Sequence, residues 1–99
     1  MERFAREDVR WVLERYGIHS ARRRTTTDQT EEMILIDAED YNKTPIHELT
    51  LALMDVLPHK KVWVAILGDR SSPRPYGEPV PVDQVVVTER DLRDTEPIW

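Results

Sequence analysis

Acidic side chains placed just after two apolar segments are the residues of this chain best suited to chemistry. Asp37 and Asp40 follow the segment 33–36, and Asp69 follows the segment 62–67. Carboxylate oxygens are the ligands that magnesium and manganese prefer, and such ions activate water for the cleavage of phosphodiesters. If the three carboxylates converge on one cation, they form the metal site of a divalent-metal-dependent hydrolase.

Several patterns typical of catalytic sites are missing from the sequence. His19, His47 and His59 are scattered and form no zinc-binding motif. The chain has three glycines and no cysteine, which excludes the glycine-rich phosphate-binding loops and a thiol nucleophile. Aspartates after strands also have a simpler explanation, because turns favour them. The sequence therefore favours a protein that is not an enzyme and holds no cofactor.

The two apolar segments predict a pair of parallel strands. Residues 33–36 and 62–67 contain no polar residue, as in strands that are buried on both faces. A helical segment separates them, which fits a strand–helix–strand crossover. The carboxyl ends of such strands share one edge of the sheet, where ligands commonly bind in open α/β folds. Asp37 and Asp69 are therefore expected to lie side by side.

The helix of this crossover is predicted over residues 44–57. Thr44 suits the N-cap, and Pro45 suits the first helical position, where its missing amide hydrogen is not needed. Pro58 ends the helix. The apolar residues extend so far around this helix that it should contact the other helix or a second copy of the protein as well as the sheet.

The remaining elements complete an α+β fold. Residues 5–16 predict a helix that Gly17 ends, and residues 18–27 fit either an edge strand or a mobile arm. Residues 85–87, three consecutive valines, predict a fourth strand. We expect one domain over residues 1–99: two layers, a mixed sheet of three to four strands and two helices, in the order α-β-β-α-β-β around a central parallel βαβ unit.

The net charge of −5 hides an uneven distribution along the chain. Residues 1–27 contain seven arginines against four acidic residues, whereas residues 28–99 contain seven basic residues against fifteen acidic ones. The basic part could meet nucleic-acid phosphates, or its charge could be compensated inside the fold. The candidate nucleic-acid-binding residues are Arg15, Arg22, Arg23 and Arg24.

Four positions are candidate protein-binding residues. Trp11 falls outside the apolar stripe of the first helix, which fits either a wide core-facing surface or an anchor in an interface. Arg74, Pro75 and Tyr76 lie in a proline-rich segment, which fits either a stiff connector or a docking segment.

The second face of the sheet decides the leading functional hypothesis. If both helices pack on one face of strands this apolar, the other face must be covered by a second copy or by another protein. The sequence contains no apolar run long enough to cross a membrane, and it begins without a signal-peptide pattern. We therefore expect a cytoplasmic, non-enzymatic protein–protein interaction or regulatory module that forms a homodimer and has no membrane partner.

Overall fold

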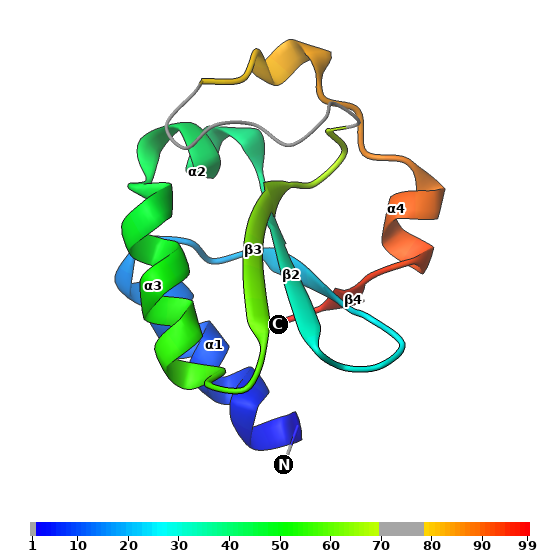
Figure 1. Ribbon diagram of the computed structural model, residues 1–99. Coiled ribbons are helices and arrows are strands. Elements are labelled where there is room, and N and C mark those ends of the chain that lie inside the picture. The colour runs from blue at the N-terminus through cyan, green and yellow to red at the C-terminus, as the bar shows by residue number, and fades with distance from the viewer. Residues whose placement is uncertain (1, 70–78) are drawn as a thin grey trace.

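The computed structural model describes residues 2–69 and 79–99, which form helices and strands in a mixed order (Figure 1). The helices are α1 (Glu2–Arg15), α2 (Ala38–Lys43), α3 (Ile46–Val56) and α4 (Glu89–Arg93), and a single 3-10 turn, η1, covers Val82–Gln84. The strands are β1 (Ala21–Thr25), β2 (Glu31–Ile36), β3 (Lys61–Ile66) and β4 (Glu96–Pro97).

The strands of the described residues form one mixed sheet in the order β3-β2-β1-β4. β2 and β3 run parallel, with Ile36 aligned with Ile66, whereas β1 pairs antiparallel with both β2 and β4. α2 and α3 connect β2 to β3, so the predicted parallel crossover is confirmed. The predicted two-layer α+β fold with a mixed sheet is confirmed as well.

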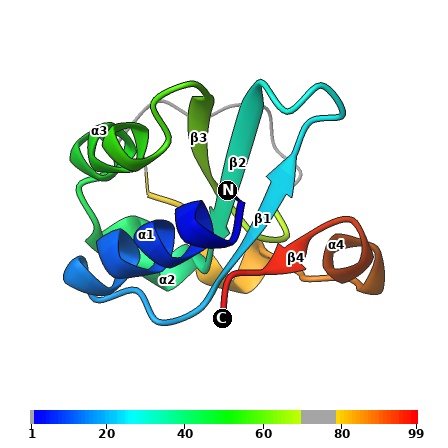
Figure 2. The same ribbon diagram turned by 90° about the horizontal axis from the view of Figure 1, so that it is seen from below.

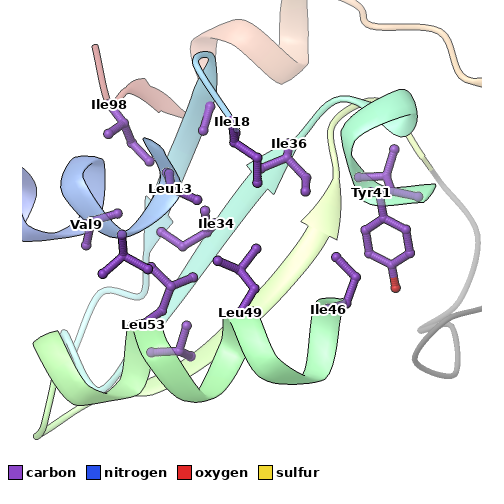
Figure 3. Close-up of a cluster of buried hydrophobic side chains, with 14 of the residues drawn as sticks. Val9, Leu13, Ile18, Ile34, Ile36, Tyr41, Ile46, Leu49, Leu53 and Ile98 are labelled. Carbon is purple, nitrogen blue, oxygen red and sulfur yellow. The ribbon is translucent and has the colours of Figure 1, made fainter. Parts of the chain in front are cut away.

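The helices α1 and α3 lie side by side on one face of the sheet (Figure 2). Their apolar side chains meet those of β2 in a core that includes Leu13, Leu49 and Leu53 (Figure 3). Burial alternates along β2: Ile34 and Ile36 face the helices and are buried, whereas Met33 and Leu35 face the other way and are only half-buried. The expectation that this strand is buried on both faces is therefore wrong for the described residues, because both long helices cover the same face.

The C-terminal end of α1 has the geometry that Gly17 predicts. Gly17 has a positive φ of 78° and donates its amide to the Glu14 carbonyl at 3.0 Å. The amide of Ile18 donates to the Leu13 carbonyl at 3.0 Å, and both of these side chains are fully buried. These contacts define a Schellman motif. The helix begins earlier than the predicted residue 5, at Glu2.

The arginine-rich segment is a strand rather than a mobile arm. It forms β1, which lies between β2 and β4 and is therefore an inner strand, not the predicted edge strand. A turn over residues 26–30 joins it to β2. In this turn Gln29 has a φ of 61°, and the Asp28 carboxylate accepts hydrogen bonds from Thr26 and Thr30.

The start of α3 differs by one residue from the prediction, because a short additional helix precedes it. Thr44 was expected as the N-cap of the long helix, but it closes α2 instead. Its hydroxyl donates to the Asp40 carbonyl at 2.6 Å, so the side chain bonds backward and cannot cap the helix that follows. Pro45 occupies the N-cap position, and α3 begins at Ile46.

The predicted fourth strand at residues 85–87 is wrong. These valines form no strand, and the backbone of Val86 instead packs against Gly68, where an added Cβ would lie 2.9 Å from the Val86 carbonyl oxygen. The fourth strand is the two-residue β4, which pairs with β1. Ile98, directly after β4, anchors this strand next to β1: its side chain is buried, and its amide donates to the Ala21 carbonyl at 3.0 Å.

Candidate interaction surface

The face of the sheet turned away from α1 and α3 carries a row of side chains that the alternation of the strands places together. We call this surface the open face, and it comprises Arg24, Glu31, Met33, Leu35, Lys61, Trp63 and Ala65. Arg24, Met33 and Trp63 are aligned across β1, β2 and β3 in the strand register. Side chains aligned in this way on one face of a sheet lie close enough to interact.

Trp63 is the largest apolar residue of this surface and lies in the middle of the outer strand β3, and 41% of it is exposed. Its indole Nε1 donates to Glu31 Oε1 at 3.2 Å, and the Lys61 ammonium lies 4.7 Å from the centre of its ring. On the neighbouring strand, Arg24 Nη2 donates to the sulfur of Met33 at 3.4 Å. The indole ring is thus held in one orientation with part of its surface free, as in the aromatic anchors of protein interfaces.

A shallow hollow of about 370 Å³ adjoins Trp63 beside the turn between β1 and β2. Its walls combine a cation, hydroxyl groups and apolar atoms, so it can accept a partner's polar or apolar group. The lining residues are Arg24, Thr25, Thr26, Thr27, Glu31, Met33 and Trp63.

The four arginines proposed for nucleic acid do not form one surface. Arg22 lies on the same face as Arg24 but is engaged with the C-terminal segment, where Nη2 donates to the carbonyls of Leu92 and Thr95, each at 2.8 Å. Arg23 points toward the helical layer, and Arg15 lies over the ring of Trp11 at 4.8 Å.

Arg23 belongs to a charged cluster around the buried carboxylate of Glu32. Glu32 is only 2% exposed and lies at the end of the core on the helical side of β2. Arg23 Nε lies 2.8 Å from Glu32 Oε1 as an ion pair, and Lys60 Nζ lies 3.2 Å from Oε2. The Thr25 hydroxyl donates to the same Oε2 at 2.8 Å. Two cations and one hydroxyl thus compensate this buried charge.

The acidic residues proposed as metal ligands are not gathered into a site. Asp37 precedes α2, Asp40 lies within it, and Asp69 lies in the turn after β3. Partial burial, and secondly the nearby charge of Asp37, raise the pKa of Asp40 above its usual range. Among residues 2–69 and 79–99, no three histidine or acidic side chains are close enough to hold a metal ion.

Of the remaining predicted binding residues, Trp11 lies among the described residues, away from the open face. Trp11 is 60% exposed on α1, in the helical layer. Arg74, Pro75 and Tyr76 lie outside the described residues.

Trp63 was not among the predicted binding residues, because residues 62–67 were interpreted as a strand buried on both faces. One available signal was the spacing within the strand: Trp63 is separated by one residue from both Lys61 and Ala65, so all three share a face that begins with a charged residue. A strand face that begins with lysine is exposed at least at that end.

Comparison of the chain with protein-family models, with curated proteins and with solved structures found no match in any of the three. Among the described residues, no helix has both the length and the apolar character needed to cross a membrane.

Proposed function

We propose that this chain is a small, non-enzymatic regulatory or adaptor module that acts through protein–protein contact and works as a homodimer. The observation that carries the proposal is the open face, where Trp63 and Met33 are partly exposed on β3 and β2 while α1 and α3 both pack on the opposite face. Burial of such apolar surface is the main driving force of protein association.

The composition of the open face supports a protein partner. It combines an aromatic residue and a methionine with arginine, residue types that are enriched in interfaces, and the adjoining hollow can receive a side chain. Trp63 is already oriented by Glu31 and Lys61, so little side-chain entropy is lost when a partner covers the ring.

Nucleic-acid binding is a second candidate, and it also depends on Trp63. Lys61 lies over this indole and Arg24 lines the adjoining hollow, an arrangement that suits stacking of an unpaired base with cations near its phosphates. The net charge of −5 and the engagement of Arg22 and Arg23 weigh against it. Binding of single-stranded RNA at low salt, lost on Arg24→Ala, would favour this candidate over the first.

The mass of the protein in solution tests the first proposal. Size-exclusion chromatography with light scattering is expected to give twice the chain mass of 11.7 kDa at high concentration. Trp63→Ala should weaken the dimer roughly 30-fold, which corresponds to an interface hot spot of about 2 kcal/mol. Trp11→Ala is the matched control, because it removes an exposed tryptophan from the helical layer. A single-chain mass at every concentration, for the wild-type protein, contradicts the proposal.

A further inference from the structure

β3 is an edge strand whose outer side is unpaired among the described residues. In the parallel pairing with β2, the amides of Lys61 and Leu67 donate to carbonyls of the β2 side, at Thr30 and Ile36. Because peptide groups alternate in direction along a strand, the N–H and C=O groups of Val62 and Val64 point away from β2. Within residues 2–69 and 79–99, no strand occupies these outward-facing hydrogen-bonding groups of β3.

The two edges of the sheet, β4 and β3, differ in how well they are protected from pairing with another chain. β4 is only two residues long and contains Pro97, features that protect a sheet edge from pairing with another chain. β3 is six residues long and has no proline, and Lys61 at its first position is its single charged residue. An exposed edge of this length and composition is a template for pairing with a strand of another chain.

Apolar side chains also flank the β3 edge on the helical side. The half-buried Ala52 and Val56 lie on the side of α3 that faces α1, as does Glu48, which accepts a hydrogen bond from the Tyr16 hydroxyl. Met54 lies on the other side of α3 and is 42% exposed, whereas Leu51, which is 52% exposed, lies on the outer surface of the helix. Figure 2 shows α3 beside β3, with α1 farther along the sheet toward β1.

We propose that two copies of this chain pair through their β3 strands, antiparallel and about a two-fold axis at Trp63, to form one continuous sheet. In this register Val62 of each copy faces Val64 of the other, and each such pair exchanges two backbone hydrogen bonds. In this register only the backbone groups of Val62 and Val64 form hydrogen bonds between the copies. The Ile66 carbonyl, which accepts the Asp69 amide at 3.1 Å, is not needed.

The side chains of β3 suit this self-pairing on both faces. On the open face, the two Trp63 rings face each other across the axis as an aromatic cross-strand pair, and each Lys61 lies opposite Ala65 rather than another lysine. On the helical side, the partly exposed Met54 of each copy lies on the side of α3 turned away from α1. A single edge that complements itself gives a closed dimer, because both β3 edges are used in the interface and the edges that remain are the short, proline-containing β4 strands.

The position of α4 favours this edge-to-edge arrangement over stacking of two open faces. Arg22 points to the open face, and its guanidinium holds the Leu92 and Thr95 carbonyls, which places α4 on that side of β1. In Figure 2, α4 lies beyond β4 on the side of the sheet away from α1 and α3. A second copy stacked on the open face would have to accommodate α4, whereas pairing at the β3 edge would not, because α4 lies at the opposite edge of the sheet (Figure 2).

Cysteine cross-linking tests the register directly, since the natural sequence has no cysteine. In the proposed dimer, residues 63 of the two copies form a non-hydrogen-bonded pair with Cα atoms about 4.5 Å apart, within the range that a disulfide spans. Trp63→Cys should therefore form a covalent dimer on mild oxidation, visible on a non-reducing gel. Trp11→Cys is the control and should remain monomeric on the same gel.

A second pair of variants keeps Trp63 in place. Lys61→Cys and Ala65→Cys should each form little covalent dimer alone, but mixing the two proteins should give a cross-linked heterodimer, because residues 61 and 65 face each other in this register. Hydrogen exchange of the wild-type protein adds a measurement without substitutions. The amides of Val62 and Val64 should become at least tenfold more protected at high than at low protein concentration.

The inference rests on the proposed homodimer, and the outcomes separate the two. A dimeric mass without cross-linking in either design, and without added protection of Val62 and Val64, overturns the β3 pairing and leaves the homodimer standing. A monomeric mass at all concentrations overturns both. Cross-linking of Trp11→Cys as efficiently as Trp63→Cys indicates random collision and likewise overturns the pairing.

Discussion

Glu32 brings a negative charge into the interior of the protein, where it is stable only with partners. Arg23, Thr25 and Lys60 supply them from β1 and from the residue before β3. The cost of removing a carboxylate from water is several kcal/mol, so the native position of this side chain depends on all three contacts. Part of the positive charge that the sequence concentrates in residues 1–27 is therefore compensated within the fold.

Glu32→Ala is expected to destabilise the protein by about 3 kcal/mol, because it leaves two partly buried cations without their counter-ion. Urea unfolding followed by circular dichroism measures the change. The matched control is Glu31→Ala, the next residue along β2 but on the open face, which should cost less than about 1 kcal/mol. Equal losses in the two variants would show that burial of Glu32 does not matter.

Asp28 makes stability depend on pH through the turn between β1 and β2. Hydrogen bonds from the Thr26 hydroxyl, and then from the Thr30 amide and hydroxyl, lower the pKa of Asp28 below its usual value. A lowered pKa in the folded state means that the ionised carboxylate stabilises the fold above the unfolded-state pKa. That contribution is lost as the pH falls through the folded-state pKa.

Asp28→Asn should therefore be less stable than the wild-type protein at neutral pH, and the difference should disappear in acid. Urea unfolding of both proteins across an acid-to-neutral pH series checks this. A difference in the free energy of unfolding that stays constant with pH would mean that the charge of Asp28 is not involved.

Gly17 and Gly68 are both required to be glycine, but for different reasons. Gly17 and Gly68 both have positive φ angles, of 78° and 89°. A Cβ added at Gly17 would have no atom within 4 Å, whereas one at Gly68 would press on the backbone of Val86 and Val87. The first site therefore needs glycine for its backbone angle alone, and the second also for the close approach of the residues that follow η1.

Gly17→Ala is expected to cost about 1 kcal/mol from left-handed backbone strain. Gly68→Ala should cost distinctly more, because the segment at Val86 must also move. Thermal unfolding of the two variants measures the difference. Equal losses would indicate that the contact between Gly68 and Val86 contributes nothing to stability.

Elements whose signals are local could be predicted from the sequence, and those set by distant contacts could not. Gly17 and Ile18 carry the complete signal for the end of α1, and the apolar segments around residues 33–36 and 62–67 define the parallel pair. Residues 85–87 have strong strand propensity but pair with neither edge of the sheet: β4 pairs with β1, and the backbone of Val86 packs against Gly68. Propensity alone does not show which edge is occupied.

The candidate surface was predicted only in part, for a reason that concerns the whole molecule. The sequence indicated that one face of the sheet would lack a helix, but it did not indicate that Trp63 lies on that face. Trp11, the tryptophan that the helical spacing brought forward, lies in the other layer. Which tryptophan lies on the open face depends on which side of the sheet the helices cover. That arrangement is set by contacts between elements and not by the spacing of residues within a single element.

For the molecule as a whole, self-association should couple to stability. A dimer that forms only from folded chains raises Tm as the protein concentration rises, and monomeric variants lose this dependence. We expect the Tm of the wild-type protein to increase over a roughly hundredfold range of concentration. Trp63→Ala should flatten that curve, and Trp11→Ala should leave it unchanged. A wild-type Tm independent of concentration would contradict the coupling.

The charged cluster at Glu32 has a consequence for cooperativity. Its members come from β1, β2 and Lys60, so the carboxylate is satisfied only after the chain has been made at least as far as Lys60 and all of these segments have met. A β1–β2 hairpin that forms during synthesis on the ribosome, before Lys60 has been added, lacks one of the two cations that pair with the Glu32 carboxylate. We therefore expect these three strands to open as a single unit, with their slowest-exchanging amides sharing one opening free energy.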